Sequence, residues 1–328
     1  MSFLTKLPAK LYDKDAFKQF TGGRDFDIGN AKAMAWMSQL AYETDEPKKI
    51  SDILTSFGLT LVEGGVVVRE SKTVLPMAST HCFVASHPNA VIVAFAGTDP
   101  ISLANWVSDF DAHLDKDTGT AEGYRVAADV VWPDLKRLLG KAVPPGGKIF
   151  VTGHSLGGAL AVLIAERIDT ELRDDMVVEA VYTFGMPRVG DQTFADLYNA
   201  RLGQRTYRLV HGEDIVPTVA PSELQFRHLG RYLPCLRQGR FDKAKLAPDV
   251  NSDQPPFDQS FAKTLREYLQ EPFSVALAII ERIKLAAALK AGVKILDMRT
   301  DPGGIVIELL PPRLRDHMPD RYIAACTG

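Results

Sequence analysis

The chain has 328 residues, of which 46% are hydrophobic and 24% charged, and its net charge is −3. This balance is typical of a globular protein with a sizeable core, and the lack of a basic patch argues against a nucleic-acid partner. Three cysteines, Cys82, Cys235 and Cys326, lie far apart in the sequence. Their spacing fits buried thiols better than a metal site or a disulfide framework, with one disulfide and one free thiol as the alternative. We expect no metal and no organic cofactor.

The N-terminus carries no long apolar segment and no small-residue cleavage site, so we expect no secretory signal peptide. The apolar run at 273–280 ends at Glu281-Arg282, far short of the length needed to cross a bilayer. The sequence therefore predicts no transmembrane segment. A protein of this kind is either cytoplasmic or exported without a recognisable leader.

Hydrophobic periodicity divides the first half of the chain into helices and short strands. The predicted elements, in order, are a helix over 27–42, strands over 66–69, 81–86 and 90–96, and a helix over 121–139. Pro133 interrupts the last of these helices. The two later strands are joined by a tight turn at His87-Pro88-Asn89.

The second half continues the alternation of strands and helices. The predicted elements are a strand over 149–152, a helix over 155–168, a strand over 177–184, a helix over 194–201, and strands over 205–210 and 225–232. Strands rich in Val, Ile and Ala that alternate with helices predict a mostly parallel central sheet covered by helices on both faces. Helical patterns at 261–269 and 273–289 break this rhythm. We interpret 240–302 as a helical insertion within one α/β domain that spans 1–328.

The most informative motif joins the strand at 149–152 to the helix that follows. The residues Gly153-His154-Ser155-Leu156-Gly157 match the nucleophile elbow, a sharp strand-to-helix turn that exposes a serine at the end of a parallel sheet. The flanking glycines avoid collisions with neighbouring backbone, and the helix N-terminus favours an oxyanion beside Ser155. The alternative is an ordinary tight turn that holds a buried serine.

A nucleophilic serine needs a base, and the base needs an orienting carboxylate. Asp214 follows a predicted strand end and precedes a proline turn, with Glu213 as its competitor. Among the histidines, His317 precedes a predicted terminal helix, whereas His228 lies within the predicted strand at 225–232. A side chain in a loop can move more freely than one within a strand, as a general base must, so we favour His317.

The oxyanion of an acyl-transfer intermediate needs two donors. We expect one from the backbone N–H of Leu156, which follows the nucleophile. The other is expected from Thr98, because Gly97-Thr98 directly follows the buried strand at 90–96. An ordinary strand exit is the alternative interpretation of this pair.

Several blocks in the same order resemble the class 3 lipases, typified by the fungal triacylglycerol lipases. The blocks are Asn30–Glu43, Phe95–Thr98, Asn105–Asp109, Gly153–Gly158, Thr183–Asp191, Glu213–Pro217 and Asp316–Tyr322. The resemblance implies an α/β-hydrolase fold, a triad of Ser155, Asp214 and His317, an oxyanion hole at Thr98 and Leu156, and a candidate lid around Trp106. Two features depart from the family: Ala96 stands where Arg is frequent, and the segment before His317 is longer.

The resemblance implies a serine carboxylic ester hydrolase, specifically a triacylglycerol lipase that forms an acyl-enzyme. The expected partners are an acylglycerol or another ester substrate and, transiently, a lipid interface. A short-chain esterase, a feruloyl-type esterase or a phospholipase A1 would use the same residues. From another class, a catalytically silent hydrolase-fold binding protein is the alternative.

Overall fold

The structure is a computed structural model that describes residues 5–71, 79–98, 102–103, 113–220, 224–248, 250 and 311–327. Trp106 and the helical patterns at 261–269 and 273–289 lie outside the described residues, as does most of the segment 240–302. The single-domain organisation with an insertion therefore stays a prediction.

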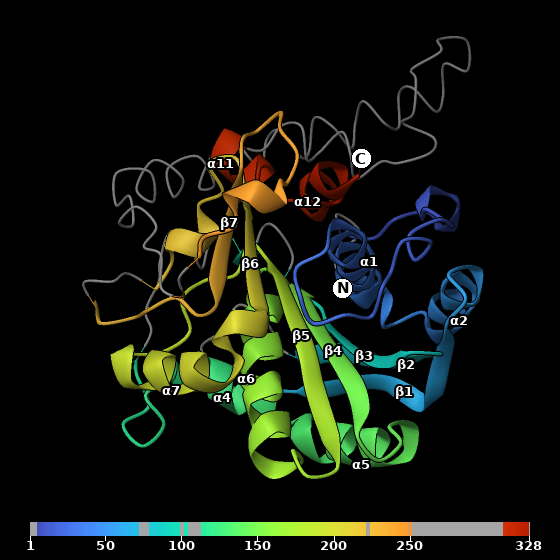
Figure 1. The fold of residues 1–328 in the computed structure, drawn as a ribbon, viewed down its shortest axis with the longest axis horizontal. Helices are drawn as coiled ribbons and strands as arrows, with labels where there is room; N and C mark the ends of the chain where they lie inside the picture. Colours follow the sequence, from blue (N-terminus) through green and yellow to red (C-terminus); the bar gives the residue numbers. More distant parts are fainter. Residues whose placement is uncertain are drawn as a thin grey trace.

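A seven-stranded sheet forms the centre of the described part of the chain, with its strands side by side in chain order (Figure 1). The strands are β1 (Thr60–Glu70), β2 (Ser79–His87), β3 (Ala90–Phe95), β4 (Gly147–His154), β5 (Met176–Phe184), β6 (Thr206–His211) and β7 (Arg231–Cys235). β1, β2 and β3 pair antiparallel, and every pairing from β3 to β7 is parallel. The predicted mostly parallel sheet is confirmed.

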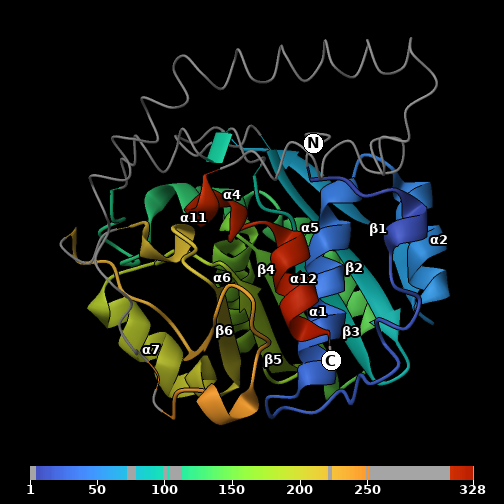
Figure 2. The same ribbon diagram turned by 90° about the horizontal axis from the view of Figure 1, so that it is seen from above.

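Helices cover both faces of this sheet (Figures 1 and 2). One face carries α4 (Glu122–Asp129), α5 (Trp132–Ala142), α6 (Leu156–Glu171) and α7 (Gln192–Leu202). The other carries α1 (Ile28–Leu40), α2 (Pro47–Ser56) and α12 (Pro319–Cys326), with α1 and α12 side by side. Short helical turns are η1 (Ala9–Leu11), η2 (Ala41–Glu43), η3 (Gly203–Arg205), η4 (Val216–Thr218), η6 (Lys243–Lys245) and α11 (Pro312–Arg315).

The central strands are buried on both faces, which explains their continuous apolar runs. In β3, Val93 and Phe95 face the α6 side of the sheet, whereas Ile92 and Ala94 face the α1 side. Two apolar clusters result, one on each side. A sheet packed in this way holds the carboxyl ends of its strands in fixed positions, where ligand sites of open α/β folds form.

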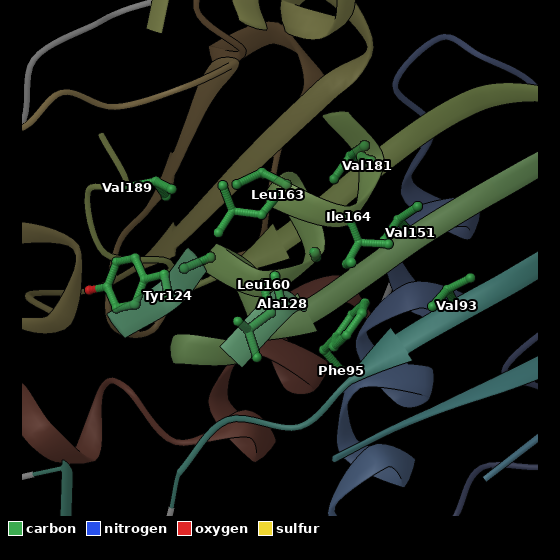
Figure 3. Packing of buried hydrophobic residues seen from close by; sticks show 14 of the residues in the cluster. Val93, Phe95, Tyr124, Ala128, Val151, Leu160, Leu163, Ile164, Val181 and Val189 are labelled. Carbon is green, nitrogen blue, oxygen red and sulfur yellow. The ribbon is translucent and has the colours of Figure 1, made fainter. Parts of the chain in front are cut away.

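Helix α6 is buried along most of its length because all of its residues from Leu156 to Ala165 are apolar or glycine. Its side chains pack on the sheet, with Leu160 and Ile164 among the cluster that includes Val151 and Val181 (Figure 3). Burial of each large aliphatic side chain contributes roughly 1.5–3 kcal/mol. This packing anchors the residue that immediately precedes the helix, Ser155.

Two predicted elements differ from the observed ones in detail. The pattern at 121–139 forms two helices, α4 and α5. Pro133 lies in the first turn of α5, where its missing N–H breaks no hydrogen bond, whereas in the middle of one continuous helix it would. The predicted strand at 225–232 is wrong for most of its length, since β7 begins only at Arg231. Gln225 and Gly230 both have positive φ, a conformation that a strand does not accommodate. His228 therefore lies in an irregular segment.

All three cysteines are free and buried. Burial raises the pKa of the Cys82 and Cys326 thiols well above its ordinary value. Within the described ranges, no helix combines the length and the apolar composition required to cross a membrane. In that same part of the chain, no three His, Cys, Asp or Glu side chains gather as a metal site would require.

Candidate active site

Ser155 occupies the turn between β4 and α6, with φ of 59° and ψ of −133°. A positive φ at a residue with a side chain costs roughly 1–3 kcal/mol and persists only where surrounding structure enforces it. The serine backbone is fixed on both sides: its N–H donates to the Phe184 carbonyl at 2.8 Å, and its carbonyl accepts from Gly158 N–H at 2.9 Å. Its hydroxyl is buried and has no hydrogen-bond partner among the described residues.

The glycines of the motif are required by close backbone approaches. A Cβ at Gly153 would lie 2.1 Å from the carbonyl oxygen of Gly157, and a Cβ at Gly157 would lie 2.6 Å from that of Phe95. Neither contact can be relieved by moving a side chain, because both involve backbone atoms. The sequence motif and the turn geometry therefore agree.

Asp214 lies three residues past the end of β6, and its side chain is fully buried. The carboxylate accepts three hydrogen bonds. Oδ1 accepts from the backbone N–H of Val216 at 2.9 Å, and Oδ2 accepts from His317 Nδ1 at 2.8 Å and from the Tyr322 hydroxyl at 2.5 Å. Three donors compensate the burial of a charge that would otherwise be costly.

His317 lies in the turn between α11 and α12, and its imidazole is fully buried. While Nδ1 donates to Asp214, Nε2 has no hydrogen-bond partner in the described part of the chain. An imidazole held in this way presents one nitrogen that can accept a proton. Asp214 and His317, which the sequence predicted as acid and base, are therefore in direct contact.

The acid, base and serine converge at the carboxyl end of β5. A Cβ at Gly185 would lie 2.6 Å from Asp214 Oδ2 and 2.7 Å from His317 Nδ1. Gly185 directly follows Phe184, whose carbonyl accepts the Ser155 N–H. The three predicted triad residues therefore all lie beside Phe184 and Gly185, at the carboxyl end of β5.

The segment predicted to supply an oxyanion donor also meets the serine turn. A Cβ at Gly97 would lie 2.8 Å from the Cβ of Ser155, so the loop after β3 runs directly beside the serine. Thr98, the next residue, is buried. Leu156 is the first residue of α6 and is also buried. Thr98 and Leu156 therefore flank the serine from two elements, and their donor roles stay predictions.

The competing acid has a different environment. The side chain of Glu213 is 72% exposed and pairs with Arg237 at 3.2 Å. Its backbone N–H donates to the Asp316 carboxylate at 2.9 Å. Since Asp214, and not Glu213, contacts the imidazole of His317, the geometry favours the predicted acid.

Tyr322 of α12 is a site residue that the sequence pattern did not indicate. Its hydroxyl accepts from the backbone N–H of His211 at 3.2 Å and donates to Asp214. Burial, and then the neighbouring Asp214 charge, hold the pKa of Tyr322 well above its ordinary value, so the hydroxyl keeps the proton that it donates. No local pattern signals this role, because Tyr322 and Asp214 are 108 residues apart.

A charged contact fixes the residue before the base. The guanidinium Nε of Arg237, just beyond β7, donates to both carboxylate oxygens of Asp316, at 3.0 Å and 2.9 Å. The hydrogen bond to Asp316 is the main cause that raises the pKa of Arg237. Asp316 is buried, and it also accepts the Glu213 N–H. The turn that carries His317 is thereby tied to the loops that follow β6 and β7.

Comparisons with known proteins identify lipases as similar to this chain. Residues 92–224 match the family model described as lipase (class 3). A secreted mono- and diacylglycerol lipase of Malassezia globosa is 27% identical over 225 residues, which cover 63% of this chain and 73% of that protein. A secreted mono- and diacylglycerol lipase of Fusarium solani is 34% identical over 145 residues, 42% of this chain and 41% of that protein.

A crystal structure of a lipase from Rhizopus microsporus var. chinensis superimposes with a TM-score of 0.54 at 20% sequence identity, covering 73% of this chain and 87% of that one. This likeness shows the fold, which is the predicted α/β-hydrolase fold. The chain spans less than half the length of the Fusarium relative. Over residues 92–224 the chain thus matches the class 3 lipase family of carboxylic ester hydrolases, and the turn between β4 and α6 that holds Ser155 lies within that range.

Proposed function

We propose that the protein is a serine hydrolase that cleaves acylglycerol esters, with Ser155 as nucleophile, His317 as general base and Asp214 as the orienting carboxylate. One observation carries the proposal. The buried imidazole of His317 is bonded through Nδ1 to Asp214, and its Nε2 is unpartnered among the described residues. The unpartnered hydroxyl of Ser155 lies at the same end of the sheet.

In the acylation step, Ser155 Oγ forms a bond to the acyl carbon while its proton passes to His317 Nε2. The tetrahedral oxyanion is stabilised by the N–H groups of Thr98 and Leu156, aided by the N-terminal end of α6. The intermediate collapses with cleavage of the C–O bond, and His317 returns the proton to the leaving alcohol. Asp214 stabilises the imidazolium and keeps Nδ1 protonated.

In the deacylation step, water attacks the acyl-enzyme, and His317 accepts its proton. The second tetrahedral intermediate occupies the same oxyanion site. Its collapse releases the carboxylic acid and returns the proton to Ser155 Oγ. All of the proton transfers pass through one nitrogen, His317 Nε2.

The acylglycerol assignment is supported by the relatives, which are named as mono- and diacylglycerol lipases. Burial of the site adds a physical argument, since the side chains of His317 and Asp214 are fully buried and Ser155 is inaccessible to solvent. We therefore expect that a substrate reaches Ser155 only after the residues that cover it move. A lipid interface that stabilises the open form would favour this movement, and Trp106 is the proposed lid residue. The relatives' names as secreted enzymes support export of this protein.

The function is tested with p-nitrophenyl esters of graded length and with emulsified triacylglycerol. We expect hydrolysis of both, and Ser155→Ala should lower kcat by a factor on the order of 10³–10⁶. Ser38→Ala, which removes another buried hydroxyl, is the control and should retain most activity. Activity of Ser155→Ala within about tenfold of the parent would overturn the nucleophile assignment. A wild-type chain that binds esters without hydrolysing them would indicate a silent binding protein.

The lipase assignment makes a separate kinetic claim. Turnover of a short triacylglycerol should rise abruptly as the substrate passes its solubility limit. Substitution of Trp106 by Gln should reduce that rise more than it reduces hydrolysis of a monomeric ester. Smooth saturation across the limit would indicate an esterase. Preferential cleavage of phosphatidylcholine vesicles would indicate a phospholipase A1, and preferential cleavage of feruloyl esters would indicate a feruloyl-type esterase.

A further inference from the structure

The residue before the nucleophile contacts the backbone of the base. The Nε2 atom of His154 lies 2.6 Å from the carbonyl oxygen of His317. The two imidazoles also pack together, with ring centroids 4.5 Å apart and an interplanar angle of 36°. His154 and Ser155 are consecutive in the chain. A single hydrogen bond therefore links the serine turn to the turn that carries the base.

The partners of His154 define its tautomer. A carbonyl oxygen only accepts hydrogen bonds, so Nε2 must carry the hydrogen that bonds to His317. The other nitrogen, Nδ1, lies 2.8 Å from the hydroxyl of Tyr42. In a neutral imidazole Nδ1 then accepts, so the Tyr42 hydroxyl donates. Tyr42 belongs to η2, directly after α1, and its hydroxyl holds the ring of His154 in this orientation.

The charge state of His154 matters because of its position against the base. His317 becomes positively charged during each proton transfer, and a second positive ring at this distance would oppose that charge. Burial is the main cause that holds the pKa of His154 well below its ordinary value, and the neighbouring His317 lowers it further. His154 thus remains a neutral donor beside the base.

We propose that His154 is a positioning residue for the reaction, which holds the His317 backbone against the serine turn and whose orientation is fixed by Tyr42. This inference rests on the proposed function, in which His317 must meet the hydroxyl of Ser155. Displacement of a reacting group by about 1 Å can cost on the order of 10²-fold in rate. A hydrogen bond made by the residue adjacent to the nucleophile limits such displacement.

The position of Tyr42 suggests two routes of action that an experiment can separate. A Cβ at Gly97 would lie 2.6 Å from the Tyr42 hydroxyl, so Tyr42 also lies behind the oxyanion loop. We infer that Tyr42 acts mainly through its hydrogen bond to His154. Loss of the Tyr42 hydroxyl should then have no further effect on kcat in a variant that lacks the His154 imidazole.

The first test compares His154→Gln with His154→Leu on a soluble ester. The amide nitrogen of Gln occupies about the place of Nε2 and restores the donor, whereas Leu removes it. We expect kcat to fall about 10- to 100-fold for Leu and no more than about fivefold for Gln, with KM nearly unchanged in both. His87→Leu, at the far end of β2, is the matched control and should keep wild-type kcat.

Either of two results would overturn the positioning role: a folded His154→Leu protein with wild-type kcat, or a Gln variant as impaired as Leu. Tyr42→Phe should lower kcat about three- to tenfold in the wild type and have no further effect in the His154→Leu background. An equal effect in both backgrounds would show that Tyr42 acts through the oxyanion loop instead.

The second test does not depend on activity, so it separates this inference from the proposed function. Nitrogen-15 spectra of histidine-labelled full-length protein at pH 7 identify the His154 resonances as those lost in His154→Gln. We expect a neutral ring with hydrogen on Nε2 and an accepting Nδ1. A protonated ring, or hydrogen on Nδ1, would overturn the inference even in an active enzyme. If the spectra agree but no ester is hydrolysed, the proposed function fails and the hydrogen-bond assignment stands.

Discussion

The serine turn and the base-bearing turn are held in different ways. The conformation of Ser155 is imposed by its own neighbours, because Gly153 and Gly157 permit backbone approaches that no other residue allows. The position of His317 depends on residues far away in the sequence. Its imidazole bonds to Asp214, 103 residues distant, and the adjacent Asp316 bonds to Arg237, 79 residues distant.

This difference shows that a sequence reveals a site residue most clearly when its neighbours in the chain determine its geometry. A motif of five consecutive residues, Gly153 to Gly157, carries the geometry of the Ser155 turn, so its pattern is recognisable. The proposed base, His317, lies between two short helices, and several separate long-range contacts hold it in position. We therefore expect substitutions around His317 to show graded effects on rate, according to how directly each contact holds the imidazole.

The largest expected effect tests the choice of base. His317→Gln should lower kcat by a factor on the order of 10³–10⁶, because in the proposed mechanism His317 accepts the serine proton. Combined with Ser155→Ala it should cost almost nothing more, since the two residues act as a unit. Initial rates on a soluble ester provide the measurement. The matched control, His228→Gln, should keep substantial turnover, and the reverse pattern would identify the wrong histidine.

A smaller effect is expected at the tyrosine that supports the acid. Tyr322→Phe removes one of three donors to the Asp214 carboxylate and should lower kcat about 3- to 30-fold, the equivalent of roughly 1–2 kcal/mol. Tyr198→Phe, which removes a buried hydroxyl bonded to Thr206, is the control. Equal kcat values for the two variants would show that Tyr322 does not support the acid.

The contact between Arg237 and Asp316 does not involve a triad residue, and it acts on His317 only through the adjacent Asp316. Arg237→Met leaves the Asp316 carboxylate with the Glu213 N–H and should lower kcat/KM about two- to tenfold, because the His317 turn loses one anchor. Arg237 is partly exposed, so solvent moderates the effect. Arg201→Met, which breaks an ion pair with Asp169, should leave kcat/KM unchanged. A parallel loss in both variants would indicate general destabilisation.

The smallest expected effect is on how the free energy of unfolding depends on pH. The pKa of His154 is lowered in the folded protein, so the unfolded chain binds a proton more readily. Stability is therefore full above the unfolded pKa of about 6.5 and falls as pH drops below it, by at most about 1.4 kcal/mol per pH unit. His154→Gln should flatten this slope in urea unfolding between about pH 6.5 and 5. Ser38→Ala, which removes a buried hydroxyl and no group that titrates in this range, is the control. An unchanged slope in His154→Gln would contradict the prediction.

Much of the fold could be predicted because its strands and helices have strong periodic patterns. The parallel sheet with helices on both faces is confirmed, and so is the family. The strand at 225–232 was wrong because positive φ at Gln225 and Gly230 overrides a local apolar pattern. Trp106 and most of the 240–302 segment lie outside the described residues, so the lid and insertion stay predictions.

The sequence indicated the residues of the candidate site to different degrees, and their roles stay predictions. Ser155 follows from a local motif, and Asp214 from its place after a strand end. His317 was favoured over His228 because a loop suits a mobile base better than a strand does. Tyr322 could not be assigned, since its role arises only when α12 packs beside the end of β6. His154 was visible in the elbow motif, but its contact with the base depends on a turn 163 residues away.

The most direct measurement is the site of labelling by a serine-directed fluorophosphonate, read by peptide mass spectrometry. Because only an activated serine reacts readily, we predict one adduct, on Ser155. The adduct should be absent in Ser155→Ala and should form at least about 100-fold more slowly in His317→Gln. An adduct on a different serine, or no adduct in a protein that hydrolyses esters, would contradict the assignment of Ser155 as the nucleophile.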